Sequence, residues 1–267
     1  MFKKLKSKQP IAESQTNNPD NSVETQNKHK KGYYQTYDNV RLIGKNMPNK
    51  VPFAVVEAYK NIRIHLMSIL SETGGKIIAF SSPNISEGKS TTSVNIAITI
   101  SQLNKKVILL DSDVRRPTIN KKLNLENEKG CTDVLAGTAT LEEAVQKYSD
   151  NLDVLTSGTV SENPSELYSS AAFDRLLDEL SQKYDYIIID TPPVNIVSDS
   201  LAVAQKCDGL VLIVRAGVTT FASFKNSLSH IKQLNIKLLG TVINGSGAEK
   251  RKYYKYYRKN YYNYGYK

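Results

Sequence analysis

The sequence of 267 residues predicts a doubly wound α/β domain with a mostly parallel sheet. Six short segments are nearly continuous runs of Ile, Leu and Val, such as "KVILLD" and "GLVLIV". Strands of this kind are buried on both faces, which is typical of a parallel sheet covered by helices. Amphipathic helical patterns alternate with these segments, as a doubly wound fold requires. We therefore expect one domain over residues 52–248.

Ordered structure is expected to begin near Pro52. Apolar residues recur at helical spacing over residues 54–70, which predicts an amphipathic helix. A further helix is predicted over residues 170–183, where apolar residues fall at i, i+3, i+4 and i+7. The predicted strands are residues 76–80, 106–111, 152–156, 184–190, 209–214 and 237–243.

The formal net charge of +10 belongs to the two ends of the chain. Residues 1–50 have 10 Lys and Arg against 4 Asp and Glu, and residues 249–267 have 7 against 1. Residues 51–248 have 19 basic and 21 acidic side chains, a net charge of −2, so the globular part lacks the basic charge that favours nucleic-acid binding. We interpret residues 1–51 as a flexible basic arm and residues 249–267 as a disordered tail.

Cys131 and Cys207 are too few for a disulfide framework or a zinc site, and they are typical of a reducing, cytoplasmic environment. The first ten residues have the charge of a signal peptide, but polar residues follow where an apolar core is required. The longest apolar runs fall far short of the roughly 18 residues that a membrane helix needs. We expect a cytoplasmic chain with no transmembrane helix.

Gly88, Lys89 and Ser90 end a loop that joins a predicted strand to a predicted helix. In this arrangement, successive backbone N–H groups and the helix dipole point at phosphate oxygens. Lys89 is expected to bridge the β- and γ-phosphates of ATP, and the Ser90 hydroxyl to ligate Mg²⁺. Pro83 replaces the first glycine of the usual G-x-x-x-x-G-K-S motif. The residues expected to bind ATP are Ser86, Glu87, Gly88, Lys89, Ser90 and Thr91.

Three aspartates follow predicted strands at their carboxyl ends, where ligands of doubly wound sheets bind. Asp111 and Asp113 are two residues apart and lie on the same face of an extended chain. Two such carboxylates repel each other unless a cation or a phosphorylation centre lies between them. A solvated turn that caps the next helix is the alternative. Asp190 follows four apolar residues, as in a Walker B strand that reaches Mg²⁺.

The segments "SEGKSTTSVNIA", "VILLDSDVRRP" and "YIIIDTPPV", followed by clustered terminal tyrosines, resemble the bacterial tyrosine kinases of capsular and exopolysaccharide synthesis. The resemblance covers about residues 52–267 and is greatest to the Gram-positive type, whose kinase chain is separate from its membrane activator. It implies the P-loop NTPase fold of the partition-ATPase-like group and ATP-dependent tyrosine kinase activity. It also makes Lys89 and Asp111 catalytic, because Asp111 would orient or deprotonate the attacking phenol. The metal would be held by Ser90, Asp113 and Asp190.

Upstream, Glu57, Lys60 and Arg63 resemble the family's Glu-x-x-Arg-x-x-Arg motif for ring-like self-association. Lys60 replaces the first arginine and cannot make the same planar bidentate contact. Ile85 and Ser86 replace the Pro-Gly pair that is usual in the phosphate loop. The resemblance further implies a membrane-bound polysaccharide chain-length regulator as activator and recruitment to the inner face of the membrane. A cognate phosphotyrosine phosphatase is expected to reverse the modification.

The last fifteen residues hold eight of the sixteen tyrosines. A phosphoryl acceptor must lie in line with the γ-phosphate, and a tail of 19 residues can extend at most about 65 Å. Phosphorylation of all eight would change the tail charge from +6 to about −6 to −10, which predicts that it disperses the oligomer. The expected acceptors, phosphorylated mainly in trans, are Tyr253, Tyr254, Tyr256, Tyr257, Tyr261, Tyr262, Tyr264 and Tyr266.

Two alternative functions are weighed against this one. Partition-type ATPases share the implied fold, but they carry an extra lysine near the start of the phosphate loop, and none occurs between Ile77 and Gly88. The basic, tyrosine-rich tail would also suit single-stranded nucleic acid, through stacking and phosphate contacts.

Overall fold

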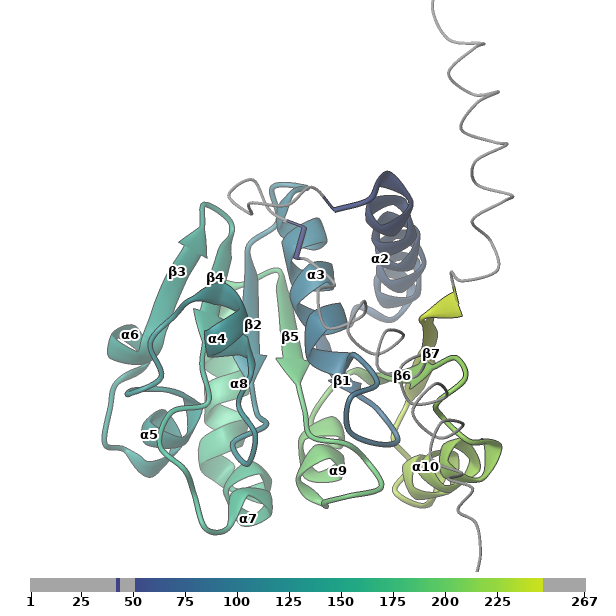
Figure 1. Cartoon of the computed structure of the whole chain (residues 1–267). Helices are drawn as coiled ribbons and strands as arrows, with labels where there is room; N and C mark the ends of the chain where they lie inside the picture. Colours follow the sequence, from purple (N-terminus) through teal and green to yellow (C-terminus); the bar gives the residue numbers. More distant parts are fainter. Residues whose placement is uncertain (1–41, 44–50, 247–267) are drawn as a thin grey trace, which may run out of the picture. The chain divides into compact units, whose positions relative to one another are not determined.

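A seven-stranded sheet organises the chain in the computed structural model, which describes residues 42–43 and 51–246 (Figure 1). The strand order is β3-β4-β2-β5-β1-β6-β7, and every neighbouring pair is parallel except β3 with β4. The mostly parallel sheet of the sequence prediction is therefore confirmed. The strands are β1 (Ile77–Ser81), β2 (Val107–Asp111), β3 (Val145–Ser149), β4 (Leu152–Leu155), β5 (Tyr186–Asp190), β6 (Gly209–Arg215) and β7 (Leu238–Asn244).

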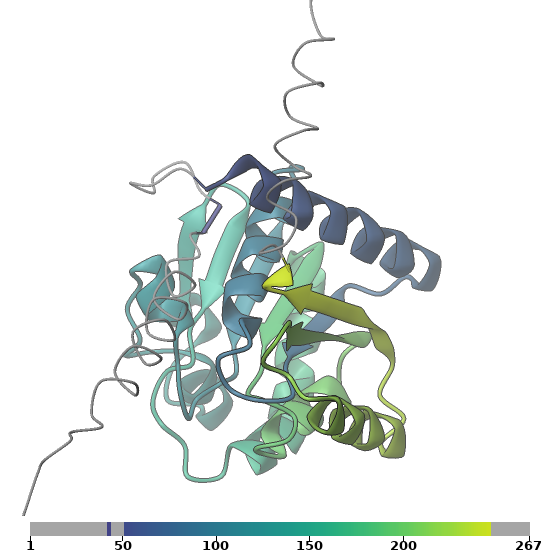
Figure 2. The ribbon, with the colours of Figure 1, turned by 45° about the vertical axis from the view of Figure 1, so that its right-hand side comes forward.

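Helices cover both faces of the sheet, as Figures 1 and 2 show. The two helices predicted by residue range are confirmed as α2 and α8, with bounds that differ by at most three residues. The helices are α2 (Phe53–Thr73), α3 (Lys89–Ser101), α4 (Ile119–Leu123), α5 (Cys131–Ala136), α6 (Leu141–Ala144), α7 (Pro164–Ser169), α8 (Ala171–Lys183), α9 (Asp199–Ala204) and α10 (Phe221–Gln233).

Alternate side chains of each central strand pack on opposite helical layers. In β1, Ile78 and Phe80 belong to the apolar cluster that includes α2 and α3. Ile77 and Ala79 pack instead into clusters built from α8, α9 and α10 on the other face. Both faces of the strand are therefore buried, which explains why the strands appear in the sequence as continuous apolar runs.

Two residues upstream of α2 belong to the same core. Leu42 and Ile43 are buried, and the Ile43 N–H donates a hydrogen bond of 2.8 Å to Oδ1 of Asn95 in α3. The rest of the predicted arm up to residue 50, and the predicted tail of residues 249–267, lie outside the described residues. Among the helices that the structure describes, none has the length and apolarity needed to span a membrane.

Candidate active site

The candidate site forms where β1, β2 and β5 end. β5 lies between the other two strands, so that Asp190 pairs in register with Phe80 of β1 and with Asp111 of β2. The loop that follows β1 then turns into α3, which begins at Lys89 after Gly88. Because carboxyl ends of parallel strands meet at one edge, the sequence-predicted residues of three distant segments come together there.

Lys89 lies at the centre of this arrangement. Its Nζ atom is 2.8 Å from Asp113 Oδ2, 3.2 Å from Asp190 Oδ2 and 3.2 Å from the Ser90 hydroxyl. Burial of the ammonium disfavours its charge, but the Asp190 and Asp113 carboxylates outweigh burial and raise the pKa of Lys89 above its ordinary value. Lys89 therefore remains a cation and compensates two buried acids.

Asp190 is fully buried and has a second set of partners on α3. Its Oδ1 accepts a hydrogen bond of 3.3 Å from the Ser93 hydroxyl, and the Ser90 side chain also bonds to this carboxylate. Burial raises the pKa of Asp190, and the positive charge of Lys89 opposes that rise. Sequence reasoning missed Ser93, although its place one turn after Ser90 on the same helix face was a usable signal.

Asp111 and Asp113 have different surroundings. Asp111 is 1% exposed, and its carboxylate accepts the backbone N–H groups of Asp113 at 3.0 Å and Ile119 at 3.2 Å. Ile119 is the first residue of α4, so Asp111 does contact the start of the next helix, but it is buried and not part of the solvated turn that was considered as the alternative. Burial, and then the nearby charge of Asp190, raise the pKa of Asp111 to about 7. Asp113 faces Lys89 instead.

The predicted ATP-binding loop contains two residues in the left-handed region. Ser86 has φ of 62° and Gly88 has φ of 99°. A Cβ atom on Gly88 would lie 2.1 Å from Nδ2 of Asn244, so that only glycine fits there without a shift of the neighbour. Between them, Glu87 turns its carboxylate into the protein and is 1% exposed. Thr91 is half-buried in the first turn of α3.

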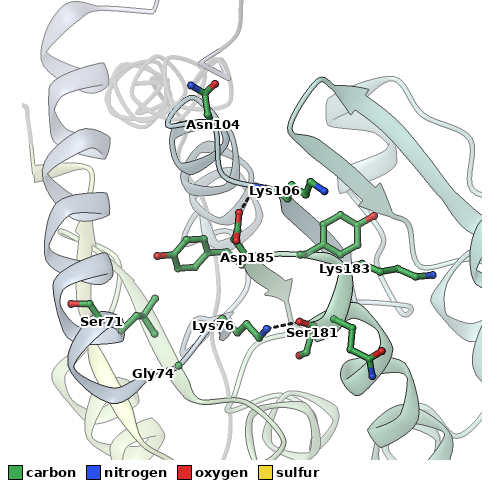
Figure 3. A pocket seen from close by; sticks show the side chains of 13 residues that line it. Ser71, Gly74, Lys76, Asn104, Lys106, Ser181, Lys183 and Asp185 are labelled. Atoms are coloured by element: carbon green, nitrogen blue, oxygen red, sulfur yellow. Dashed lines mark hydrogen bonds between the residues drawn. The ribbon is translucent and has the colours of Figure 1, made fainter.

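A hollow of about 640 Å³ lies at the other edge of the sheet, where β1, β2 and β5 begin. Figure 3 shows the side chains that line it, among them Lys76, Lys106 and Lys183. Lys76 donates to the carbonyl of Ser181, and Lys183 pairs with two glutamates outside the hollow. None of the predicted site residues lines this hollow, so it is separate from the candidate active site.

The three residues predicted for self-association all lie on α2. Lys60 pairs with Glu57 at 2.8 Å within the helix, and Arg63 donates from Nη1 to the Thr99 carbonyl of α3 at 2.6 Å. These contacts are within one chain, so self-association through this motif stays a prediction. The eight predicted acceptor tyrosines lie outside the described residues.

Comparison with known proteins gives concordant matches. A family model described as an AAA domain matches residues 75–238. The tyrosine-protein kinase YwqD of Bacillus subtilis is 37% identical over 202 residues, which cover 75% of this chain and 85% of that protein. The tyrosine-protein kinase CpsD of Streptococcus pneumoniae is 37% identical over 180 residues, which cover 67% of this chain and 79% of that protein.

Solved structures, among them a tyrosine kinase domain, also resemble this chain. The kinase domain of the Escherichia coli tyrosine kinase Etk matches with a TM-score of 0.69 and 30% identity, covering 75% of this chain and 82% of the other. The chimerical protein CapA2B2 matches with a TM-score of 0.69 and 33% identity, covering 76% and 88%. The septum site-determining protein MinD of Pyrococcus horikoshii, complexed with Mg-ADP, shares the fold at 22% identity and a TM-score of 0.56, covering 66% and 72%.

Proposed function

Because the chain belongs to the family of bacterial tyrosine-protein kinases, we propose that it uses ATP to phosphorylate the tyrosines of its own C-terminal cluster. In the cell, this reaction would regulate the synthesis and export of a capsule or another exopolysaccharide. One observation carries the proposal, namely that Lys89 lies within hydrogen-bond distance of Asp113 and Asp190, and that Asp111 is the strand partner of Asp190. Phosphoryl transfer needs a lysine that contacts the phosphates and acidic residues that hold Mg²⁺ and orient the nucleophile.

The loop and the start of α3 would bind the triphosphate of ATP. Backbone N–H groups between Ser86 and Thr91 supply donors at the N-terminus of a 13-residue helix, where anions bind favourably. We propose that Lys89 leaves its two aspartates when the nucleotide arrives and pairs with phosphate oxygens. The ammonium stays paired with anions, and Mg²⁺ would compensate the two carboxylates that it leaves.

The oxygen atoms beside Lys89 are also suitable ligands for Mg²⁺. The Ser90 hydroxyl and the Asp113 and Asp190 carboxylates are oxygen ligands, which this ion prefers. Within residues 51–246, no three His, Cys, Asp or Glu side chains are placed to hold a metal by themselves. Mg²⁺ usually keeps several waters and substrate phosphates as ligands, so that a complete protein cage is not required. When bound, it would supply positive charge to the phosphate oxygens.

Asp111 would act as the general base. Its carboxylate would take the proton of the acceptor phenol as the phenol oxygen bonds to the γ-phosphorus, while the bond from phosphorus to ADP breaks and ADP leaves. A pKa of about 7 suits this role at neutral pH, because the group is then near half-ionised. Since Asp111 is 1% exposed, we propose that residues 113–119, which donate backbone N–H groups to it, move when the acceptor binds.

The proposed acceptors are the tyrosines from Tyr253 to Tyr266, and transfer would occur mainly between subunits of a ring. Glu57, Lys60 and Arg63 would contribute to that ring. Eight phosphates would give the tail a charge of about −6 to −10, so that crowded tails repel one another and the ring disperses. A phosphotyrosine phosphatase would restore it. The sedimentation of phosphorylated and tail-deleted chains with ATP present measures this effect, and equal sedimentation contradicts it.

A membrane-bound chain-length regulator would activate the kinase and hold this cytoplasmic chain at the inner face of the membrane. The name of the chimera CapA2B2 joins CapA to CapB, and CapB of Staphylococcus aureus is a relative of this chain at 32% identity; this supports the existence of a partner protein.

The deciding experiment incubates the purified full chain with Mg-ATP, with and without the cytoplasmic fragment of the activator, and maps phosphotyrosine by mass spectrometry. We expect Lys89→Met and Asp111→Ala to abolish the signal, and the exposed control Lys225→Met to keep it. Deletion of residues 249–267 should leave ATP binding intact and remove most acceptors. Mixing Lys89→Met full chain with active chain that lacks the tail tests transfer in trans, because only the inactive chain then carries acceptors.

Two outcomes would contradict the proposal. ATP hydrolysis without phosphotyrosine, in the presence of the activator, would favour the partition-type ATPase alternative, whose fold is the same. Phosphotyrosine confined to residues outside 253–266 would remove the proposed acceptors. Retention of the chain on single-stranded DNA, lost at high salt and on deletion of residues 249–267, would instead support nucleic-acid binding by the tail.

A further inference from the structure

The phosphate loop contains a buried carboxylate that its anionic ligand would repel. Glu87 is 1% exposed, and it lies next to the Gly88-Lys89 pair. Its Oε2 accepts the backbone N–H of Asn84 at 2.9 Å, and its Oε1 accepts the Asn84 side-chain amide at 3.1 Å. A negative charge in a site for anions weakens binding unless it does something else for the loop. The contacts of Glu87 indicate that it fixes the shape of the loop.

That shape is costly for the chain to adopt. Ser86 has φ of 62°, a left-handed conformation that is unfavourable for a residue other than glycine. Conformations of this kind persist only where surrounding contacts hold them. Here, Arg215 of β6 donates from Nη1 to the Ser86 carbonyl at 2.8 Å. Asn244, which ends β7, donates from Nδ2 to the Glu87 carbonyl at 3.1 Å. The loop is therefore held from two strands that lie far away in the sequence.

Thr219 completes this support. It lies between β6 and α10, and its hydroxyl donates to Glu87 Oε1 at 2.7 Å. The Thr219 hydroxyl oxygen also accepts the backbone N–H of Arg215 at 2.8 Å. One hydroxyl thus uses both its donor and its acceptor capacity, and it links the end of β6 to the buried carboxylate of the loop. Valine has the same shape and can make neither bond.

We propose that Thr219 is a positioning residue for the nucleotide. Through Glu87, it holds the loop N–H groups in the arrangement that phosphate requires before the nucleotide arrives. Loops that are ordered in advance bind more tightly, because less conformational entropy is lost on binding. This inference rests on the proposed assignment of residues 86–91 to ATP, and it adds a residue that lies 132 positions from Glu87 in the sequence.

The test compares three variants of the full chain. Thr219→Val removes both hydrogen bonds, and Thr219→Ser keeps the hydroxyl. Thr220→Val is the matched control, because Thr220 caps α10 by accepting the Ser223 N–H at 3.2 Å and, within the described part of the chain, its hydroxyl makes no hydrogen bond to the loop. Calorimetry measures the Kd for ADP, kinetics separates KM for ATP from kcat, and amide hydrogen exchange without nucleotide reports on the Asn84 N–H that Glu87 accepts.

We expect Thr219→Val to raise the Kd for ADP roughly tenfold, as loss of one hydrogen bond to a charged group predicts, and to raise KM more than it lowers kcat. Exchange of the Asn84 amide should become faster. Thr219→Ser should retain wild-type values in all three measurements, and Thr220→Val should leave the Kd and the Asn84 exchange unchanged.

Wild-type ADP affinity in Thr219→Val would overturn the inference, as would equal losses in Thr219→Val and Thr220→Val. Failure of Thr219→Ser to keep the affinity would show that the hydroxyl is not responsible and would overturn it as well. Absence of ADP binding by the wild-type chain is a different result, because it overturns the proposed nucleotide site itself.

Discussion

The Lys89 ammonium and the Asp113 carboxylate are 2.8 Å apart, and both side chains are largely buried. Asp190 lies 3.2 Å from the same ammonium, so that one cation faces two acids when no nucleotide is present. The residue expected to bind phosphate therefore also stabilises the ligand-free fold. A substitution of Lys89 removes both functions, and its effects on activity and on stability have to be measured separately.

Lys89→Met should destabilise the ligand-free chain by about 3 kcal/mol, because removing one partner leaves buried charges uncompensated. Urea unfolding without nucleotide measures this change. The exposed Lys225 supplies the control, and Lys225→Met should change the free energy of unfolding by less than about 0.5 kcal/mol. Equal unfolding free energies for the two variants would show that the contacts of Lys89 contribute nothing to the fold.

The raised pKa of Asp111 predicts how the stability of the ligand-free chain depends on pH. Burial, followed by the charge of Asp190, raises this pKa to about 7, whereas an aspartate in an unfolded chain titrates at about 3.9. The folded chain therefore keeps a proton that the unfolded chain loses. The stabilisation of the folded chain by this proton is fully present below the pKa that Asp111 has in the unfolded chain. It is lost as the pH rises through about 7, the pKa of Asp111 in the folded chain.

Asparagine cannot titrate, so Asp111→Asn lacks this dependence. We expect the wild-type chain to lose more stability than Asp111→Asn between about pH 6 and pH 8, in urea unfolding without nucleotide or metal. The difference between the two chains should thus move in favour of the variant as pH rises. A difference that stays constant over this range would mean that Asp111 does not titrate near 7.

Most of the sheet could be predicted from the sequence, because strands buried on both faces consist of uninterrupted aliphatic residues. The exception is β3 (Val145–Ser149), whose sequence "VQKYS" is mostly polar and only partly buried. It lies at the edge of the sheet and pairs antiparallel with β4, so one side lacks a neighbouring strand and needs no aliphatic run. Its pairing depends on tertiary context, to which local pattern gives little access.

Some residues of the candidate site could likewise be predicted from the sequence, and others could not. Asp111 and Asp190 could be predicted because each ends a recognisable strand, and Lys89 because it follows the loop that joins β1 to α3; the ends of parallel strands converge. Thr219 and Asn244 could not, because they meet the loop only through the arrangement of β6 and β7. Glu87 was predicted to bind ATP from its place in the motif, and its inward orientation depends on these distant partners.

Gly88 and Gly74 provide a matched pair of left-handed glycines. A Cβ on Gly88 would lie 2.1 Å from Asn244 Nδ2, whereas a Cβ on Gly74, which follows α2, would meet nothing within 4 Å. Gly88→Ala should weaken ADP binding at least tenfold, because it strains the loop and displaces Asn244 from the Glu87 carbonyl. Gly74→Ala should cost about 1 kcal/mol of stability and leave the affinity unchanged. Calorimetry compares the two, and equal affinities would contradict this account.

Ile43, which lies upstream of α2, is anchored to α2 and α3. It is 7% exposed, packs in the cluster that contains Tyr59 and Leu66 of α2, and donates its N–H to the buried Asn95 of α3. Ile43→Ala should therefore cost about 2–3 kcal/mol in urea unfolding, since it removes buried methyl groups and leaves a cavity. Ile64 lies on α2 with 58% exposure, and Ile64→Ala should cost less than about 0.5 kcal/mol. If the two variants unfold at the same urea concentration, this anchor does not stabilise the domain.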